Sequence, residues 1–323
     1  MTLTGKQGNW VNNTQYTILN YYTLNTVRCT LEKENIIMKM DFVKMHGLGN
    51  DFILTDCLNK SLGDSSFLSY LAKKLCDRNF GIGADGLILI LPSSKADLRM
   101  RIFNFDGSEA QMCGNGIRCF AKYAYENKLI SKNKFAVETL AGIITPELIF
   151  QDLKNKKVLR IKVNMGTPKL RRREIPINGE DTPKVVNEIL KINPEQTFKI
   201  TCVSMGNPHC IIFVDDVQSV PVDEIGPKIE NHPFFPEKTN VEFIHILNRK
   251  EINFRVWERG VGETLACGTG ACVALVAAVL NNKTDRKATI HLQGGDLDIQ
   301  WANDGNIYMT GPAELVFRGE MTI

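Results

Sequence analysis

The sequence carries almost no net charge. Its 39 Lys and Arg residues exceed its 36 Asp and Glu residues by three, which excludes the extended basic surface that nucleic-acid binding requires. It also lacks a long hydrophobic run, because the longest strongly apolar segment, residues 271–280, is about half as long as a membrane span. We therefore expect no nucleic-acid partner and no membrane partner.

Paired cysteine motifs are absent as well. Nine cysteines, an odd number without a Cys-x-x-Cys spacing, form neither a disulfide framework nor a zinc-ligand pattern. Free thiols in this number are typical of a reducing compartment. We expect a cytoplasmic protein without a metal site.

Residues 1–37 lack amphipathic order and are rich in Asn, Thr and Tyr. They have neither the basic start and apolar core of a signal peptide nor the Arg- and Ser-rich composition of a transit peptide. Terminal segments of this kind are commonly poorly ordered, so we expect residues 1–37 to be a disordered N-terminal extension. A regular hydrophobic pattern begins at Met38.

What the sequence does contain is a sixteen-residue stretch that occurs twice. The first copy runs from Arg101 to Gly116 and the second from Arg255 to Gly270, aligned without a gap at an offset of 154 residues. An arginine, a glutamate and a Cys-Gly-x-Gly sequence recur in register. Each copy predicts a strand, a polar loop and a helix start. The cysteine stands where backbone amides and the helix dipole stabilise a thiolate.

A second repeat extends the duplication over most of each half. Asn50 precedes Cys113 by 63 residues, and Asn207 precedes Cys267 by 60. We expect an α+β fold of two pseudo-symmetric domains, residues 38–157 and 158–312, with residues 313–323 returning to the first. In each domain a mostly antiparallel sheet would be rolled around the cysteine-bearing helix. The active site would lie in the cleft between the domains.

Other elements are predicted from local spacing. Apolar residues at helical spacing predict helices at residues 66–77 and 182–190, and residues 143–150 are expected to form one strand. Residues 81–86 have the form of a dinucleotide fingerprint, but a helix precedes them and a strand follows, the reverse of what that motif needs. We interpret these glycines as turn residues and the basic triplet at 171–173 as a solvated face.

Duplicated domains that face each other place equivalent residues on opposite walls of one site. A thiol on each wall suits inversion of a carbon centre, because one thiolate removes a proton while the opposite thiol delivers one to the other face. Free cysteine has a pKa of about 8.5, and a helix N-terminus is expected to lower it toward the working pH. The amides that follow Cys113 and Cys267 suit a carboxylate and the charge that develops on it.

Several longer motifs stand out along the chain: the stretches from His46 to Phe52, Phe103 to Cys119, Glu138 to Gly142, Met205 to Cys210 and Glu258 to Cys272. Together they resemble the motifs of the diaminopimelate epimerases. The resemblance extends from Met38 to the C-terminus. It implies an enzyme of lysine and peptidoglycan biosynthesis that interconverts LL- and meso-2,6-diaminopimelate without a cofactor, usually as a homodimer.

The resemblance also implies roles for individual residues. Cys113 and Cys267 would be the acid/base pair, with Cys267 accepting and Cys113 donating the proton in the LL-to-meso direction. His209 and Glu258 would adjust the thiols. The implied substrate contacts are Asn50, Asn104, Gly114, Asn115, Asn207, Asn240, Glu258, Arg259, Gly268 and Thr269.

Physical chemistry supports only part of this assignment. Arg259 offers a bidentate fork for the distal carboxylate of a substrate with two zwitterionic ends. From the residues alone, a turn-forming role for Asn240 and a structural hydrogen bond for His209 stay open. Gly86 stands where some family members carry glutamine, so one substrate contact is missing or replaced by water.

Other functions stay open at this point. Proline and hydroxyproline racemases also use two thiols but need no distal-carboxylate arginine such as Arg259, and a phenazine-pathway isomerase lacks the cysteine pair. A redox sensor would join Cys113 and Cys267 in a functional disulfide and would need redox partners. A nucleotide-binding module at residues 81–86 would bind adenine nucleotides.

Overall fold

The computed structural model describes residues 39–151 and 157–322. Lys39–Ile323 form one compact unit. The interpretation of residues 1–37 concerns residues outside this range. The predicted division into domains at residues 157 and 158 stays a prediction.

Each half of the chain contains the same series of elements. In the first half these are β1 (Lys39–Gly47), β2 (Asn50–Asp56), α1 (Ser65–Cys76), β3 (Gly86–Leu91), β4 (Leu98–Asn104), β5 (Glu109–Ala110), α2 (Gly114–Glu126), β6 (Val137–Thr139) and β7 (Gly142–Ile144). In the second half they are β11 (Gln196–Ser204), β12 (Pro208–Phe213), α3 (Val222–Glu230), β13 (Asn240–Asn248), β14 (Glu251–Glu258), β15 (Gly262–Glu263), α4 (Gly268–Leu280), β16 (Lys287–Leu292) and β17 (Gly295–Trp301).

The strand pairing repeats with the elements. From β1 to β7, leaving out the short β5, successive pairs are antiparallel, parallel, antiparallel, parallel and antiparallel. From β11 to β17, leaving out β15, the order of pairings is the same. The predicted duplication and the mostly antiparallel α+β fold are therefore confirmed at the level of topology.

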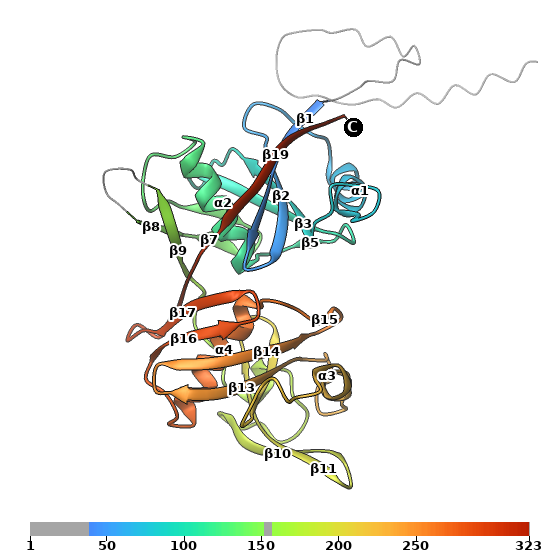
Figure 1. Ribbon diagram of the computed structural model, residues 1–323, viewed down its shortest axis with the longest axis vertical. Coiled ribbons are helices and arrows are strands. Elements are labelled where there is room, and N and C mark those ends of the chain that lie inside the picture. Colours follow the sequence, from blue (N-terminus) through green and yellow to red (C-terminus); the bar gives the residue numbers. More distant parts are fainter. Residues whose placement is uncertain (1–38, 152–156, 323) are drawn as a thin grey trace, which may run out of the picture. The chain divides into compact units, whose positions relative to one another are not determined.

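The remaining strands extend the two sheets. They are β8 (Glu147–Phe150), β9 (Val158–Asn164), β10 (Val185–Asn193), β18 (Ile307–Gly311) and β19 (Glu314–Thr322). The C-terminal strand β19 pairs antiparallel with β1 at the edge of the first sheet (Figure 1). Strands β8 and β9 pair with each other and, through β18, belong to the second sheet.

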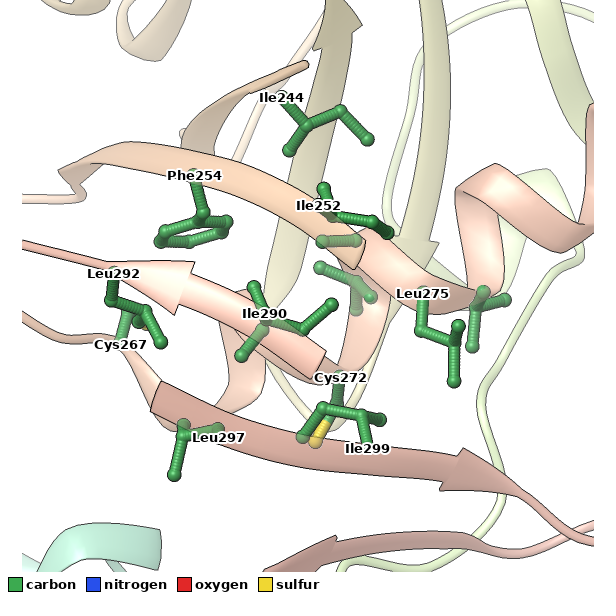
Figure 2. Close-up of a cluster of buried hydrophobic side chains, with 14 of the residues drawn as sticks. Ile244, Ile252, Phe254, Cys267, Cys272, Leu275, Ile290, Leu292, Leu297 and Ile299 are labelled. Carbon is green, nitrogen blue, oxygen red and sulfur yellow. The ribbon is translucent and has the colours of Figure 1, made fainter. Parts of the chain in front are cut away.

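The cysteine-bearing helices are the centres of the two largest cores. Nearly every side chain of α4 is apolar and buried, as expected for a helix without a polar face. Figure 2 shows Cys272 and Leu275 of this helix among buried strand residues that include Ile290 and Ile299. In the first half α2 packs in the same way against β1–β4 and β9.

The helix predicted at residues 182–190 is wrong, because this segment forms strand β10. Val185 and Leu190 are both buried although they lie five residues apart, a spacing that would put them on opposite faces of an unbroken strand. The pairing of β10 with β11 shifts register between Val185 and Glu188, and Asn187 between them has φ 55°. This bulge restores both residues to the core side and produces the spacing that imitates a helix.

Two further expectations need correction. Residues 143–150 form two strands rather than one, and β7 and β8 belong to different sheets. The triplet at 171–173 is not uniformly solvated, because Arg172 is buried and forms an ion pair with Glu188. Helix α3, which was not predicted, occupies the place of α1 in the duplicated order, so the repeat contained a signal for it.

Helix α3 packs closely against Trp257, and this contact requires Gly226. A Cβ at residue 226 would lie 2.5 Å from Cγ of the indole. We predict that Gly226→Ala lowers the free energy of unfolding by about 1–3 kcal/mol through overpacking. Denaturant titration should show this, with the exposed Lys228→Ala of the same helix as the control; equal midpoints for the two variants would contradict the prediction.

Candidate active site

The two repeated cysteines are the N-cap residues of α2 and α4. Each has an extended backbone, with φ −138° at Cys113 and −119° at Cys267. Each sulfur accepts a hydrogen bond from the amide three residues later, Gly116 N at 3.5 Å and Gly270 N at 3.4 Å. The predicted placement of both thiols at helix starts is confirmed.

The arginine and glutamate of the repeat have a structural role that the sequence did not show. Arg101 binds Glu109 with Nε–Oε1 2.6 Å, and Arg255 binds Glu263 with Nε–Oε1 2.7 Å. Each pair spans from the long strand to the short strand that precedes the cysteine. The recurring glutamate therefore shapes the loop that presents the thiol.

The two helix starts converge on Met309. A Cβ at Gly114 would lie 2.8 Å from Met309 Cε, and one at Gly268 would lie 3.2 Å from Met309 Sδ and 3.7 Å from Asn115 Oδ1. The turn of Gly49 also meets the second half, since a Cβ there would lie 2.9 Å from Leu265 Cδ1. The glycines after each cysteine thus let the two N-termini approach the same space.

Cys113 faces an oriented amide. Its sulfur lies 3.7 Å from Asn50 Oδ1, which also accepts a hydrogen bond from Asn115 Nδ2 at 3.1 Å. Asn50 Nδ2 donates to Asp85 Oδ2 at 2.7 Å. Asp85, which the sequence did not single out, therefore fixes which atom of the amide faces the thiol, and that atom is an acceptor.

Cys267 faces a hydroxyl that ends a polar chain. Its sulfur lies 3.5 Å from Thr269 Oγ1, which accepts from Asn207 Nδ2 at 3.5 Å. Asn207 Oδ1 lies 3.0 Å from His209 Nε2, and His209 Nδ1 lies 2.6 Å from Glu242 Oε1. His209 therefore reaches Cys267 only through Asn207 and Thr269, and Glu242 at the far end was missed in the sequence.

The remaining predicted contacts of the second half differ in whether their polar groups are already hydrogen-bonded. Glu258 accepts a hydrogen bond from Thr264 Oγ1 at 2.5 Å. Asn240 is spent on the backbone, because it donates to Pro208 O and accepts from Arg259 N. The exposed Arg259 donates to Glu237 O, and none of the carboxylates in the described segments forms an ion pair with it. Its fork is available to a ligand carboxylate.

The predicted contacts of the first half offer fewer polar groups that are not already hydrogen-bonded. Asn104, at the end of β4, donates to Ser108 Oγ at 2.9 Å. Gly86 pairs with Asn104 across the sheet, and a Cβ there would lie 2.9 Å from Phe103 O. No larger side chain fits this backbone without a shift, so the glutamine of other family members has no room here.

Both thiols are less acidic than the sequence suggested. Burial raises the pKa of Cys113, while the amides of Gly116 and Asn115 and the Arg118 guanidinium oppose that rise. Burial raises the pKa of Cys267 well above its ordinary value, and the carboxylates of Glu258 and Glu242 add to this. The expectation of a lowered thiol pKa is wrong because desolvation outweighs the helix N-terminus.

A buried arginine supports the start of α2. Arg118 is 0% exposed, donates from Nη1 to Gly114 O at 3.1 Å and from Nε to Pro312 O at 3.0 Å. Pro312 lies between β18 and β19, so the guanidinium links the first helix to the segment that leads into the returning C-terminal strand. Gly47 and Gly311 leave room for it.

The other cysteines of the described segments are free thiols. Cys119 and Cys272 are 0% exposed and pack in the two cores, as predicted. No group of three or more His, Cys, Asp or Glu side chains suited to a metal ion occurs in the part of the chain that the structure describes. Among the same residues no helix is long and apolar enough to cross a membrane.

Known structures show which class this fold represents. A phenazine biosynthesis protein of the PhzF family from Bacillus anthracis superposes with a TM-score of 0.64 at 18% identity, covering 88% of this chain and 100% of its own. A hydroxyproline epimerase from Agrobacterium vitis gives 0.63 at 12% identity, covering 88% and 93%. The fold is that of the two-domain racemases, epimerases and related isomerases.

Sequence comparison narrows the class to one family. The diaminopimelate epimerase family model matches residues 42–171 and 201–316. The diaminopimelate epimerase of Moorella thermoacetica is 56% identical over 286 residues, 88% of this chain and 100% of that protein. The enzyme of Pelotomaculum thermopropionicum is 55% identical over 281 residues, 87% and 98%. The chain belongs to the diaminopimelate epimerase family.

The turn that carries Asn50 is held by an ion pair with a pH signature. Asp51 Oδ2 lies 2.6 Å from Lys44 Nζ, with both side chains largely buried, and Oδ1 binds Arg78 at 2.8 Å. Burial raises the pKa of Asp51, but hydrogen bonds and charges from Arg78 and Lys44 outweigh it and hold the pKa below its ordinary value.

We predict that Asp51→Asn destabilises the protein by about 3 kcal/mol at neutral pH, because it leaves Lys44 buried without its partner. A carboxylate whose pKa is lower in the folded than in the unfolded protein stabilises the fold at pH values above its unfolded pKa. This contribution is lost as the pH falls through the folded pKa. The difference between wild type and variant should therefore shrink below about pH 4 in denaturant titrations. Asp285→Asn, in the exposed pair with Arg249, is the control; a pH-independent difference would refute the assignment.

Proposed function

We propose that this protein interconverts LL- and meso-2,6-diaminopimelate by proton transfer between Cys113 and Cys267, without a cofactor, in the cytoplasm. In the LL-to-meso direction Cys267 accepts the α-proton and Cys113 donates one to the opposite face, and the roles reverse in the other direction. Family membership supports the substrate. The observation that carries the mechanism is the pair of N-capping thiols whose helix starts converge on Met309.

Both thiols accept an amide hydrogen bond, but their side-chain neighbours differ in a way that fits these roles. Cys113 faces an acceptor, Asn50 Oδ1, which suits a protonated donor. Cys267 faces a hydroxyl, which suits a proton acceptor. Because burial raises both pKa values, the thiolate that accepts the proton is a strong base, and a substrate ammonium group beside it would favour formation of that thiolate.

The amides that open each helix are suited to the carboxylate next to the reacting carbon. Gly114, Asn115, Gly268 and Thr269 contribute these amides, and two helix N-termini stabilise the negative charge that grows as the proton leaves. Arg259, free of carboxylates in the described segments, receives the distal carboxylate. Asn104, Asn207 and Glu258 supply the remaining contacts to the distal amine, while Asn240 acts by holding the Arg259 backbone.

The decisive measurement is proton NMR of diaminopimelate in heavy water, with reduced protein, a chelator and no pyridoxal phosphate. We predict loss of the α-proton signal together with conversion between the LL and meso forms. Cys113→Ala and Cys267→Ala should each lower the rate by at least about a hundredfold, because each face loses its proton-transfer group.

The control is Cys76→Ala, which removes a buried thiol of α1. Normal turnover by either active-site variant would contradict the two-thiol mechanism. Exchange with proline but not with diaminopimelate would favour the proline-racemase alternative instead.

We also propose that the protein is a homodimer that associates through β19. This strand lies at the edge of the first sheet, and its consecutive residues Leu315, Val316 and Phe317 are 41%, 55% and 45% exposed. An apolar edge strand is an open template for pairing with another chain. A second copy can satisfy it symmetrically, β19 against β19.

We predict that Val316→Glu converts the dimer to a monomer, because it places a charge in the paired edge. Light scattering after size-exclusion chromatography measures this directly. Ile189→Glu, on an exposed residue of β10 at the edge of the other sheet, should leave the mass unchanged. A dimer that survives Val316→Glu would place the interface elsewhere.

A further inference from the structure

The two halves differ at one buried position beneath their cysteine helices. A Cβ at Gly116 would lie 3.1 Å from Ile88, and a Cβ at the equivalent Gly270 would lie 3.1 Å from Glu242 Oε1. The neighbouring strand differs in the same way. Strand β2 carries Phe52 opposite Gly86, and at the equivalent place β12 carries His209 opposite Asn240. An apolar pair therefore fills this place in one half and an acid–imidazole pair in the other.

Packing does not require the polar pair, since the first half builds the same fold with Phe52 and Ile88. Glu242 and His209 are both 0% exposed, and burying two ionisable groups is costly unless they are paired. Glu242 Oε2 has no hydrogen-bond partner in the described segments, so even the pair is not fully satisfied. Only the half that contains Cys267 carries the energetic cost of burying this pair, which indicates that Glu242 and His209 have a role connected with Cys267.

The hydrogen bonds show a consistent direction toward that thiol. Asn207 Nδ2 donates to Thr269 Oγ1, which leaves Asn207 Oδ1 as the acceptor for a proton on His209 Nε2. With Nε2 protonated, the proton between Nδ1 and Glu242 Oε1 is shared within the buried pair, whose net charge is zero wherever that proton lies. Since Thr269 Oγ1 accepts from Asn207, its own hydrogen is free to point at Cys267 Sγ, 3.5 Å away.

We infer that Glu242 is a positioning residue for the second thiol: it fixes the His209 ring and, through Asn207, directs the Thr269 hydroxyl hydrogen at the Cys267 sulfur. This inference rests on the proposed role of Cys267 as a proton acceptor. A hydroxyl that donates stabilises the thiolate, which offsets part of the effect of burial and of the Glu258 and Glu242 carboxylates. In the first half Asp85 and Asn50 present an acceptor instead, so the two thiols are polarised in opposite senses.

The test is the pH midpoint for alkylation of Cys267 by iodoacetamide, followed by mass spectrometry of its peptide in a Cys113→Ser background. The key variant is the double substitution His209→Phe with Glu242→Ile, which copies the pair that already packs in the first half. We expect the midpoint to rise by about one pH unit, because the directed donor is lost. In the otherwise unmodified enzyme the same pair should lower kcat by about tenfold to a hundredfold with KM little changed.

The opposite results are equally informative. A lower midpoint would show that Glu242 acts only as a nearby negative charge, and an unchanged midpoint that the pair is merely structural; either overturns the inference. Glu188→Gln, which removes a carboxylate from the ion pair with Arg172, is the control and should leave the midpoint in place.

Two single variants keep the test valid if the double variant does not fold. Glu242→Gln can still donate to Nδ1 and should move the midpoint by less than about 0.3 pH units, whereas a clear fall contradicts the inference. Thr269→Val removes the last donor and should raise the midpoint as the double variant does; no rise contradicts it. Because alkylation needs no substrate, a protein that shows these shifts but no epimerisation would refute only the proposed function.

Discussion

The structure depends on two helix N-termini that are buried with a cysteine as their cap. A buried N-terminus leaves amide donors that need acceptors, and here a sulfur accepts from the third amide of each helix. The arrangement works only because Gly116 and Gly270 have no Cβ. An added methyl group would meet the capping cysteine's own Cβ at 3.4 Å or 3.2 Å and the side chains beneath the helix. The other N-terminal amides stay available for a ligand carboxylate.

Duplication explains how both thiols reach the same space, and divergence explains how they come to differ. The two halves share strand pairing, helix positions and the Arg–Glu pair that shapes each cysteine loop. They differ in the groups that orient each thiol's neighbour. Asp85 and the Asn50 amide present an acceptor to Cys113. A hydrogen-bonded chain from Glu242 through His209 and Asn207 to Thr269 ends at Cys267. The two thiols therefore face different groups although their helices occupy equivalent places in the fold.

Sequence reasoning succeeded where a signal was local or repeated. The helix starts at both cysteines, the mostly antiparallel α+β fold and the packing role of Cys119 and Cys272 were predictable from motif, spacing and duplication. It failed at β10, where a bulge at Asn187 gave a strand the apolar spacing of a helix. It also missed α3, a helix of 9 residues that contains Pro227, a residue that usually ends or kinks a helix.

The sequence by itself determined the family, the duplication and the identity of the two thiols, because these depend on residue types at fixed spacings along the chain. Only the tertiary structure decided that burial outweighs the helix N-terminus at both thiols, that Asn240 is spent on the backbone and that Arg259 forms no ion pair with a carboxylate of the described segments. It alone revealed Asp85 and Glu242, which lie 28 and 25 residues before their cysteines. Desolvation and hydrogen-bond direction depend on which strands are neighbours, and that information exists only once the sheets have formed.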